Sequence, residues 1–447
     1  MEIKSYNIAP TNENILESII NNTYGRNETL RCYLELLDKA KDISVFSLNA
    51  DWGEGKTFFT LQAKMILEYL NPNCVQDEEI KTRLDALFVQ PESKIKKPAM
   101  TRTIFPVYYN AWLYDDHKDP LTSFLYFLSV TFQKKYSKLD SGGLEKLGSA
   151  LNIITTWKYG VTFDSKKIGE AITGKDISSK IAYLEDVKQL VDEAFHDLLE
   201  ENDGLIVFVD EIDRCNPRYA VDFLECIKHF FDCANVQFVF STNIKQLAES
   251  ICNVYGAGFD GTRYLNKFFD CPLELPPVER TDVLRNVSTN LDKNYLSDFA
   301  QSLVKSLPFS IREINDFYGQ MPLIMDKCHN TILRTRSFWD CNSKNDFSYI
   351  CYPITLFALS LVDRKKYDGF KSGHGESLFL ELLLQWDGWQ DLLYATLTKH
   401  LDTETSRAVL IEAIEEDYRR IFSPAALQDT QASKVRHKIF ELASLLG

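Results

Sequence analysis

The residues from Ser47 to Thr57 have the types and spacing that could bind a phosphate. They read Ser-Leu-Asn-Ala-Asp-Trp-Gly-Glu-Gly-Lys-Thr, after a short β-prone run and before residues 58–70, whose apolar positions recur at helical spacing. The two glycines let backbone N–H groups turn inward, the lysine brings a positive charge to the β- and γ-phosphates, and the threonine offers a hydroxyl to Mg²⁺. The run predicts a phosphate-binding loop between a strand and a helix.

This loop departs from the pattern G-x-x-x-x-G-K-[ST] at its first position, where Ala50 stands. The alternative is a Gly-Lys-Thr helix start that binds no ligand, but the order of strand, loop and helix favours the loop. The residues that we expect to contact a nucleotide are Asp51, Trp52, Gly53, Glu54, Gly55, Lys56, Thr57 and Phe58. Lys56 is expected to serve catalysis as well as binding.

An acidic pair, Asp210 and Glu211, directly follows the five apolar residues 205–209. Such a run predicts a strand that is buried on both faces and delivers two acids at its carboxyl end. We expect Asp210 to hold Mg²⁺ together with Thr57, and Glu211 to polarise the water that attacks the γ-phosphate. An acidic pair alone also occurs as a helix cap or a solvated turn. Beside the loop, the pair favours nucleotide hydrolysis over binding alone.

Three further apolar runs, at residues 104–109, 236–242 and 268–275, also have the character of strands. Five strands that alternate with helices predict an α/β fold with a parallel, doubly wound sheet. The run 104–109 lies between the two motifs in sequence, and an extra strand between the loop strand and the acidic strand is typical of NTPases that use a catalytic glutamate.

Asn243 directly follows the run 236–242 and is the remaining candidate from the residue pattern. Its amide could reach the γ-phosphate or the attacking water. It could also cap the helix that is expected to start at Ile244, and the two roles are compatible.

Composition limits the remaining classes. The 447 residues, 45% of them hydrophobic, predict two or three globular domains. No stretch approaches 18 uncharged apolar residues, and the N-terminus lacks the apolar core of a signal peptide, so we expect a cytoplasmic protein without a membrane anchor. The ten cysteines form no C-x-x-C pair, which argues against zinc and disulfides.

The net charge of −14 argues against wrapping of nucleic acid independent of sequence. Lysines are concentrated locally between residues 134 and 180. This region has two interpretations: a surface for nucleic acid or a partner, or a solvated helical face.

Several motifs together resemble a known family. They are Trp52-Gly53-x-Gly-Lys-Thr, Asn110-Ala111-Trp112, Asp210-Glu211-Ile212-Asp213-Arg214-Cys215, Tyr264-Leu265-x-Lys267-Phe268-Phe269 and Leu273-x-Leu275-Pro276. Over residues 40–320 the chain resembles the KAP family of P-loop NTPases. The resemblance implies ATP and Mg²⁺ as cofactors and a sheet order like that of AAA+ and STAND ATPases. Members often carry transmembrane helices between the first motifs, whereas the insertions here, at residues 71–103 and 115–200, are expected to be helical and soluble.

The resemblance also assigns roles outside the two main motifs. Arg312 is placed as a catalytic sensor that contacts the γ-phosphate, with an ion pair inside the lid as the alternative. Arg263 and Lys267 are placed where a cation reaches the nucleotide of a neighbouring subunit, with a solvated helix end as the alternative. Asp213 and Arg214 belong either to the site or to a salt bridge within the turn.

Near the N-terminus, Tyr24-Gly25-Arg26 resembles the short segment that lines the adenine in AAA+ proteins. Trp52 and Trp112 are expected to pack rather than to stack on a base.

We therefore expect a P-loop NTPase core at residues 1–280, a helical lid at 281–340 and an α-helical C-terminal domain at 341–447. The first functional hypothesis is a Mg-ATP-hydrolysing switch or motor that self-associates and acts on a separate effector protein. The resemblance implies a setting in bacterial defence against phage or mobile elements. The second hypothesis is a scaffold with slow or no turnover, whose helical half binds a protein or nucleic acid.

Overall fold

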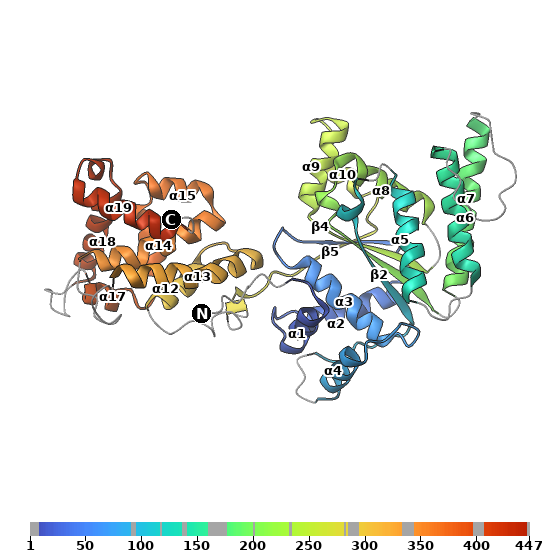
Figure 1. The fold of residues 1–447 in the computed structure, drawn as a ribbon, viewed down its shortest axis with the longest axis horizontal. Coiled ribbons are helices and arrows are strands. Elements are labelled where there is room, and N and C mark those ends of the chain that lie inside the picture. Colours follow the sequence, from blue (N-terminus) through green and yellow to red (C-terminus); the bar gives the residue numbers. More distant parts are fainter. Residues whose placement is uncertain are drawn as a thin grey trace. The chain divides into compact units, whose positions relative to one another are not determined.

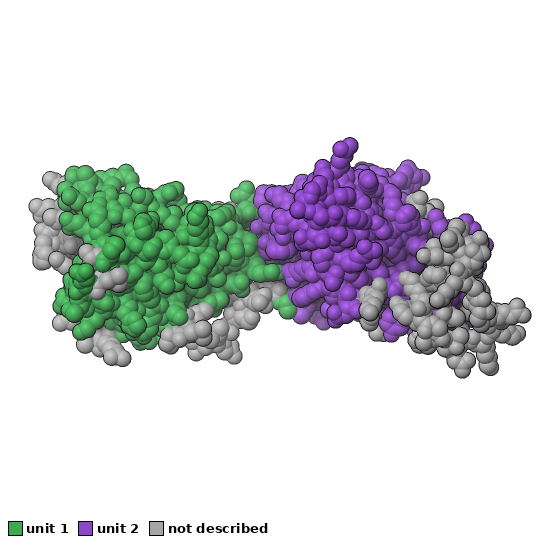
Figure 2. Space-filling model, turned by 90° about the horizontal axis from the view of Figure 1, so that it is seen from above, with its two compact units in different colours: residues 1–9, 278–447 green, residues 10–277 purple. Residues whose placement is uncertain are grey.

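The chain forms two compact units, seen in Figure 2. The computed structural model describes residues 9–90, 95–116, 119–135, 141–159, 177–199, 202–231, 235–280, 283–284, 295–332, 344–396 and 406–444. One unit spans Pro10–Pro277 and holds both nucleotide motifs, and the other contains Val278–Gly447 together with Met1–Ala9. The finer division of residues 281–447 into a lid and a C-terminal domain stays a prediction.

A parallel sheet of five strands organises the first unit (Figure 1). The strands are β1 (Val45–Asn49), β2 (Ile104–Asn110), β3 (Gly204–Asp210), β4 (Val236–Thr242) and β5 (Cys271–Glu274). Their order across the sheet is β2-β3-β4-β1-β5, and the pairings between neighbours are parallel. The predicted α/β class and the five parallel strands are confirmed.

The strand between the loop strand and the acidic strand is β4, so the structure corrects the interpretation given to residues 104–109. Those residues form most of β2, which lies at the edge beyond β3. In the register, Asn49 at the end of β1 lies opposite Thr242, and Asp210 at the end of β3 lies opposite Ser241. The carboxyl ends of three adjacent strands thus bring the two motifs together.

Successive side chains of β3 point to opposite faces of the sheet, and both faces are buried, as the apolar run 205–209 predicted. All seven residues of this strand are buried. Leu205, Val207 and Val209 contribute to one hydrophobic core. Ile206 and Phe208 point to the other face and join a second core with residues of α1, α2 and α3. Two layers of helices therefore hold the sheet between them.

The helices of this unit include those of the two insertions. They are α1 (Asn12–Asn21), α2 (Asn27–Lys39), α3 (Lys56–Leu70), α4 (Glu78–Val89), α5 (Pro120–Lys135), α6 (Ser141–Tyr159), α7 (Ile177–Leu198), α8 (Pro217–Phe230), α9 (Ile244–Tyr255) and α10 (Gly261–Leu265), with 3₁₀ turns η1 (Ala111–Tyr114) and η2 (Ile212–Arg214). Among the described helices of the whole chain, none is long and apolar enough to cross a membrane.

Part of the locally basic region lies in described helices: Lys134-Lys135 end α5, and Lys146 and Lys158 belong to α6 (Figure 1). Lys146 of α6 forms ion pairs with Glu193 and Asp197 of α7, at 3.4 and 2.9 Å. Two other parts of the region, Lys138 and Lys166-Lys167, lie outside the described residues. The contacts of Lys146 favour the interpretation as a solvated helical face, and a partner surface here stays a prediction.

The described part of the second unit is helical. Its helices are α12 (Tyr295–Ser306), α13 (Ile311–Ile332), α14 (Lys344–Val362), α15 (Arg364–Lys371), α16 (Glu376–Leu384), α17 (Trp389–Thr396), α18 (Arg407–Phe422) and α19 (Thr430–Ala443), with a 3₁₀ turn η4 (Pro424–Leu427). Apolar residues recur at helical spacing throughout residues 378–397, yet two helices, α16 and α17, form there. The break lies near Gly388, which packs closely against the Trp386 ring.

Asp38, at the end of α2, fixes the segment that leads into β2. Its carboxylate accepts hydrogen bonds from the backbone N–H of Thr101 and of Arg102, at 2.8 and 3.0 Å, and from the Thr101 hydroxyl at 2.7 Å. The Arg102 guanidinium lies 3.6 Å away, and the Asp38 side chain is wholly buried. A buried carboxylate with this many donors joins the first helical layer to the sheet.

We expect Asp38→Asn to destabilise the unit by about 2–3 kcal/mol, because an amide removes the charge and turns an NH₂ group toward donors. The matched control is Asp42→Asn, at an exposed position nearby, which should change the free energy of unfolding by less than about 0.5 kcal/mol. Urea unfolding of the full chain measures both. Equal stability of the two variants would contradict the anchoring role of Asp38.

Candidate functional site

The predicted loop connects β1 to α3 and has the backbone that an anion site needs. Gly53 and Gly55 adopt φ values of 83° and 79°, in the left-handed region that favours glycine. Gly55 is the N-cap of α3 and offers no side chain, so the first N–H groups of the helix are left to face the loop. Ala50 is absent from the described residues with positive φ. Alanine therefore adopts the backbone conformation of this position without the strain that a positive φ would impose.

Lys56 is folded back onto the loop. Its ammonium group donates to the carbonyl oxygens of Ala50 and Asp51, at 2.6 and 3.0 Å. Burial lowers the pKa of this lysine, and the carboxylates of Asp213 and Asp210 act in the opposite direction. The ammonium group lies within the loop, where it could bind a phosphate, but its hydrogen bonds go to two carbonyl groups of the loop.

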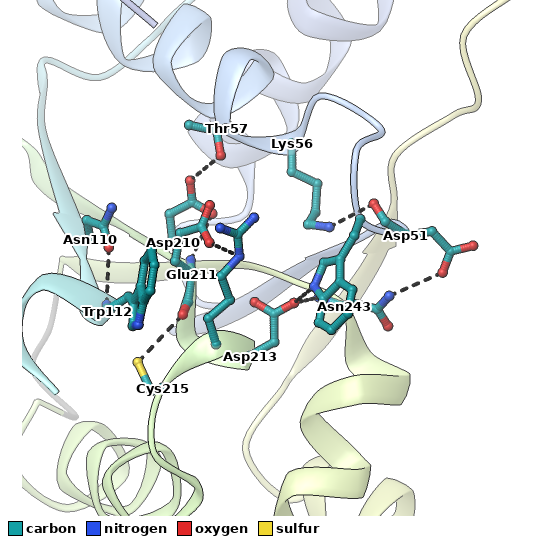
Figure 3. Close-up of polar contacts among 12 residues, drawn as sticks. Asp51, Lys56, Thr57, Asn110, Trp112, Asp210, Glu211, Asp213, Cys215 and Asn243 are labelled. Atoms are coloured by element: carbon teal, nitrogen blue, oxygen red, sulfur yellow. Dashed lines mark hydrogen bonds and ion pairs between the residues drawn. The ribbon is translucent and has the colours of Figure 1, made fainter. Parts of the chain in front are cut away.

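One carboxylate oxygen of Asp210 accepts hydrogen bonds from two hydroxyl groups. Thr57 Oγ1 donates to Asp210 Oδ2 at 2.7 Å (Figure 3). The Tyr108 hydroxyl donates to the same oxygen at 2.8 Å. The backbone N–H of Glu211 donates to the other oxygen at 2.9 Å. Burial raises the pKa of Asp210, and the hydrogen bonds from Thr57 and Tyr108 partly oppose that shift.

Glu211 stands in an unusual backbone conformation, with φ of 63°. Such a value is uncommon for a residue with a side chain and marks a position that the surroundings impose. The Glu211 carboxylate forms an ion pair with Arg214 at the far end of η2. The Arg214 guanidinium also lies over the Trp112 ring, with its central carbon 5.7 Å from the ring centroid.

Asp213 joins the loop to the end of β4. Its Oδ2 accepts a hydrogen bond from the Trp52 indole at 2.7 Å and one from the backbone N–H of Asn243 at 3.1 Å. The prediction left Asp213 and Arg214 between a site role and a salt bridge within the turn. The structure separates them, because Arg214 pairs within the turn and Asp213 reaches across to the loop.

Asn243 caps α9, as one of its two predicted roles required. Its side-chain oxygen accepts from the N–H groups of Lys245 and Gln246, at 3.1 and 3.2 Å. Its amide nitrogen donates to Asp51 at 3.2 Å, on the loop side (Figure 3). The contact to a γ-phosphate stays a prediction.

Arg26, from the segment predicted to line an adenine, contacts the loop from the other side. Its guanidinium donates to the carbonyl oxygen of Glu54 at 2.7 Å and also to the carbonyl of Pro276. Burial lowers the pKa of Arg26 to about 10. Tyr24 meets the Phe58 ring edge-on, with centroids 5.9 Å apart. These residues border the loop, and their contact with a base stays a prediction.

The contacts of the three cations predicted from the resemblance do not test their roles. Arg263 and Lys267 are exposed, and the contacts seen are local: the Arg263 N–H donates to Asp260, and the Lys267 ammonium lies 5.5 Å from the Tyr264 ring centroid. Arg312 is exposed in α13 of the other unit, one turn before Asp316. The proposed roles of all three in a γ-phosphate site stay predictions.

Two features of the site were missed from sequence. Tyr108 was read only as part of a buried strand, although it lies two residues before the polar end of β2 and so near the edge where the acids gather. Trp52 was expected to pack, but its side chain is 47% exposed and its indole is a hydrogen-bond donor to Asp213.

Comparison with known proteins gives one assignment. No curated protein matches the chain. A structure of the Aeropyrum pernix Orc1 protein in complex with DNA is similar at 15% identity, over 93% of this chain and 92% of that chain, with a TM-score of 0.30. A similarity at this level says nothing about what this chain binds. Residues 11–339, well over half of the chain, match the KAP family P-loop domain. The chain therefore belongs to the KAP family of P-loop NTPases.

Proposed function

We propose that this protein binds Mg-ATP at residues 50–58, hydrolyses it, and acts through that cycle as a switch or motor on a partner. Its family makes it a P-loop NTPase. The observation that carries the finer proposal is the 2.7 Å hydrogen bond between Thr57 Oγ1 and Asp210 Oδ2. P-loop enzymes hold Mg²⁺ between a loop hydroxyl and an aspartate that ends a strand, and this contact joins such a pair.

The donor set suits magnesium. Mg²⁺ prefers oxygen ligands and keeps several waters, so one hydroxyl and one carboxylate leave room for phosphate oxygens. When bound, the ion neutralises negative charge on the β- and γ-phosphates. Thr57 and Asp210 would hold it, and Tyr108 would keep its hydrogen bond to Asp210 and so fix the orientation of that carboxylate.

The phosphates have their own donors. The N–H groups at the start of α3 face the loop, and the Lys56 ammonium lies on the carbonyl groups of the same loop. A phosphate carries more negative charge than those carbonyls, so it would draw Lys56 away from Ala50 and Asp51. On binding, the Lys56 ammonium group would thus exchange the two carbonyl groups for a phosphate oxygen, and it would move only a short way to do so.

Hydrolysis needs a group that orients the attacking water. Glu211 follows the metal ligand Asp210 directly, and we assign it that role. Asn243, whose amide nitrogen faces the loop at Asp51, would contact the γ-phosphate or the same water. Arg312 of the other unit would contact the γ-phosphate as a sensor.

The partner is proposed to be a separate effector protein. The helices of the second unit offer a surface for it, and the family resemblance supports a setting in bacterial defence against phage or mobile elements. The net charge of −14 does not support nucleic acid as the main partner.

Lys56→Ala should weaken Mg-ATP binding by about 10- to 100-fold, because charge-assisted hydrogen bonds to phosphate are lost. Lys64→Ala is the matched control: Lys64 lies in the same helix, paired with Glu68 at 2.7 Å, and its loss should leave affinity unchanged. Calorimetric titration with a non-hydrolysable ATP analogue measures both. A Lys56→Ala protein with the affinity of the wild type would refute the loop assignment.

Glu211→Gln should retain Mg-ATP binding while kcat falls on the order of 10²-fold or more, since the amide cannot accept a proton from the water. The control is Glu249→Gln, an exposed position on α9. Steady-state phosphate release and nucleotide titration separate the two effects. Unchanged turnover would remove Glu211 from the mechanism and favour the scaffold hypothesis.

We further propose that ATP promotes self-association and that Arg263 or Lys267 acts on the nucleotide of a neighbouring subunit. A mixture of Glu211→Gln subunits with Arg263→Ala or Lys267→Ala subunits should then regain activity, because some interfaces combine an intact site with an intact cation. Sedimentation with and without nucleotide provides the companion measurement. One mass in both conditions, with no recovery on mixing, would leave a monomeric switch.

A further inference from the structure

The carboxylate proposed to activate water is occupied by a neighbouring cation. Glu211 forms its ion pair with Arg214, and the two side chains are 16% and 30% exposed. The positive charge of a guanidinium in such an ion pair stabilises the carboxylate anion and makes it a poorer acceptor for a water proton. Loss of the Arg214 contact would therefore make Glu211 a better acceptor for a proton of the attacking water.

Arg214 is held on its other side by an aromatic ring. Its guanidinium carbon lies 5.7 Å from the centroid of Trp112, a residue that is 50% exposed. Cation–π contacts of this kind are attractive and favour a guanidinium over an ammonium. The backbone N–H of Trp112 donates to the Asn110 side chain at 3.1 Å, which fixes the main chain at the start of η1. Arg214 therefore lies between Glu211 and the Trp112 indole.

The turn that carries Arg214 is connected to the phosphate-binding loop. Asp213, its neighbour in η2, accepts the 2.7 Å hydrogen bond from the Trp52 indole of the loop (Figure 3). If phosphate binding rearranges residues 51–55 and so moves Trp52, this hydrogen bond would transmit the movement to η2. The loop and the Glu211–Arg214 pair are thus joined through two side chains.

We propose that Arg214 is a positioning residue that withholds Glu211 from the γ-phosphate site until nucleotide occupies the loop. The Trp112 ring stabilises Arg214 in the position that pairs with Glu211. When nucleotide moves Trp52, the hydrogen bond from Trp52 to Asp213 transmits the movement to η2, and the Glu211–Arg214 pair opens. The inference rests on the proposed catalytic role of Glu211 and adds to it a resting state that this chain's own residues impose.

Kinetics of single variants test the withheld state. Arg214→Ala should raise kcat for Mg-ATP by about fivefold, the factor expected when a partly exposed ion pair is lost, with KM changed by less than about twofold. Arg214→Lys should give a smaller rise, because an ammonium keeps the ion pair and packs less well on the ring. Trp112→Ala should raise kcat partially, and Trp112→Phe should raise it less. Arg218→Ala is the matched control, an exposed arginine paired with Asp222 on α8.

Each alternative has a distinct outcome. A fall in kcat for Arg214→Ala would make Arg214 a stabiliser of the transition state and overturn the proposal. An unchanged kcat with a lower Tm would reduce it to a structural residue, which also overturns the proposal. Glu211→Gln is measured beside these variants: if it turns over normally, the proposed function itself has failed, and if it is inactive while Arg214→Ala is no faster, only the withheld state has failed.

Fluorine spectroscopy provides a readout independent of turnover. In protein labelled with 5-fluorotryptophan, Trp112→Phe identifies the resonance of Trp112. Mg²⁺ with a non-hydrolysable ATP analogue should shift this resonance toward its position in nucleotide-free Arg214→Ala. In Trp52→Phe, which lacks the indole donor, the same addition should shift it less. If the analogue leaves the chemical shift of Trp112 unchanged in the wild type, the proposal is overturned.

Discussion

The buried carboxylate of Asp210 is the group around which the site is arranged. It lies at the carboxyl end of β3 with 2% of its surface exposed, and burial raises its pKa. A carboxylate in such surroundings needs donors or a cation. The hydroxyl groups of Thr57 and Tyr108 meet this need from α3 and from β2. Through these two hydrogen bonds, Asp210 fixes the position of the first turn of α3 relative to β2, the strand at the edge of the sheet.

The other polar groups of the site are also engaged within the protein. Lys56 donates to loop carbonyls, Glu211 pairs with Arg214, and Asp213 accepts from Trp52. Nucleotide and metal must replace some of these contacts, so the net free energy of binding is smaller than the sum of the new contacts. In the structure without nucleotide, Lys56, Glu211 and Asp213 thus already have partners within the protein.

Sequence alone predicted the parts of this site that depend on local order. The loop is specified by consecutive residues, and the acids follow directly from an apolar run, so strand, loop and helix could be placed from one-dimensional pattern. Strand neighbours could not: β4 rather than β2 separates β1 from β3, because pairing is decided by packing across the whole sheet. The Tyr108 contact depends on the register of β2 against β3. Trp52 meets Asp213 across 161 positions of sequence, which no local pattern encodes.

The geometry also indicates why ATP and ADP could leave the protein in different states. A ligand shifts a conformational equilibrium only by its difference in affinity for the two states. In the proposed mode of binding, the β-phosphate would meet Lys56 and the start of α3 in both nucleotides, whereas only ATP would add a γ-phosphate. The γ-phosphate would lie toward Asn243 and the turn of Asp213 and Arg214, so its loss would remove contacts with that turn. If the difference at that turn amounts to about 1.4 kcal/mol, the ratio of released to withheld states changes tenfold between the nucleotides. A change of that size at one short turn is enough to bias what a partner protein binds.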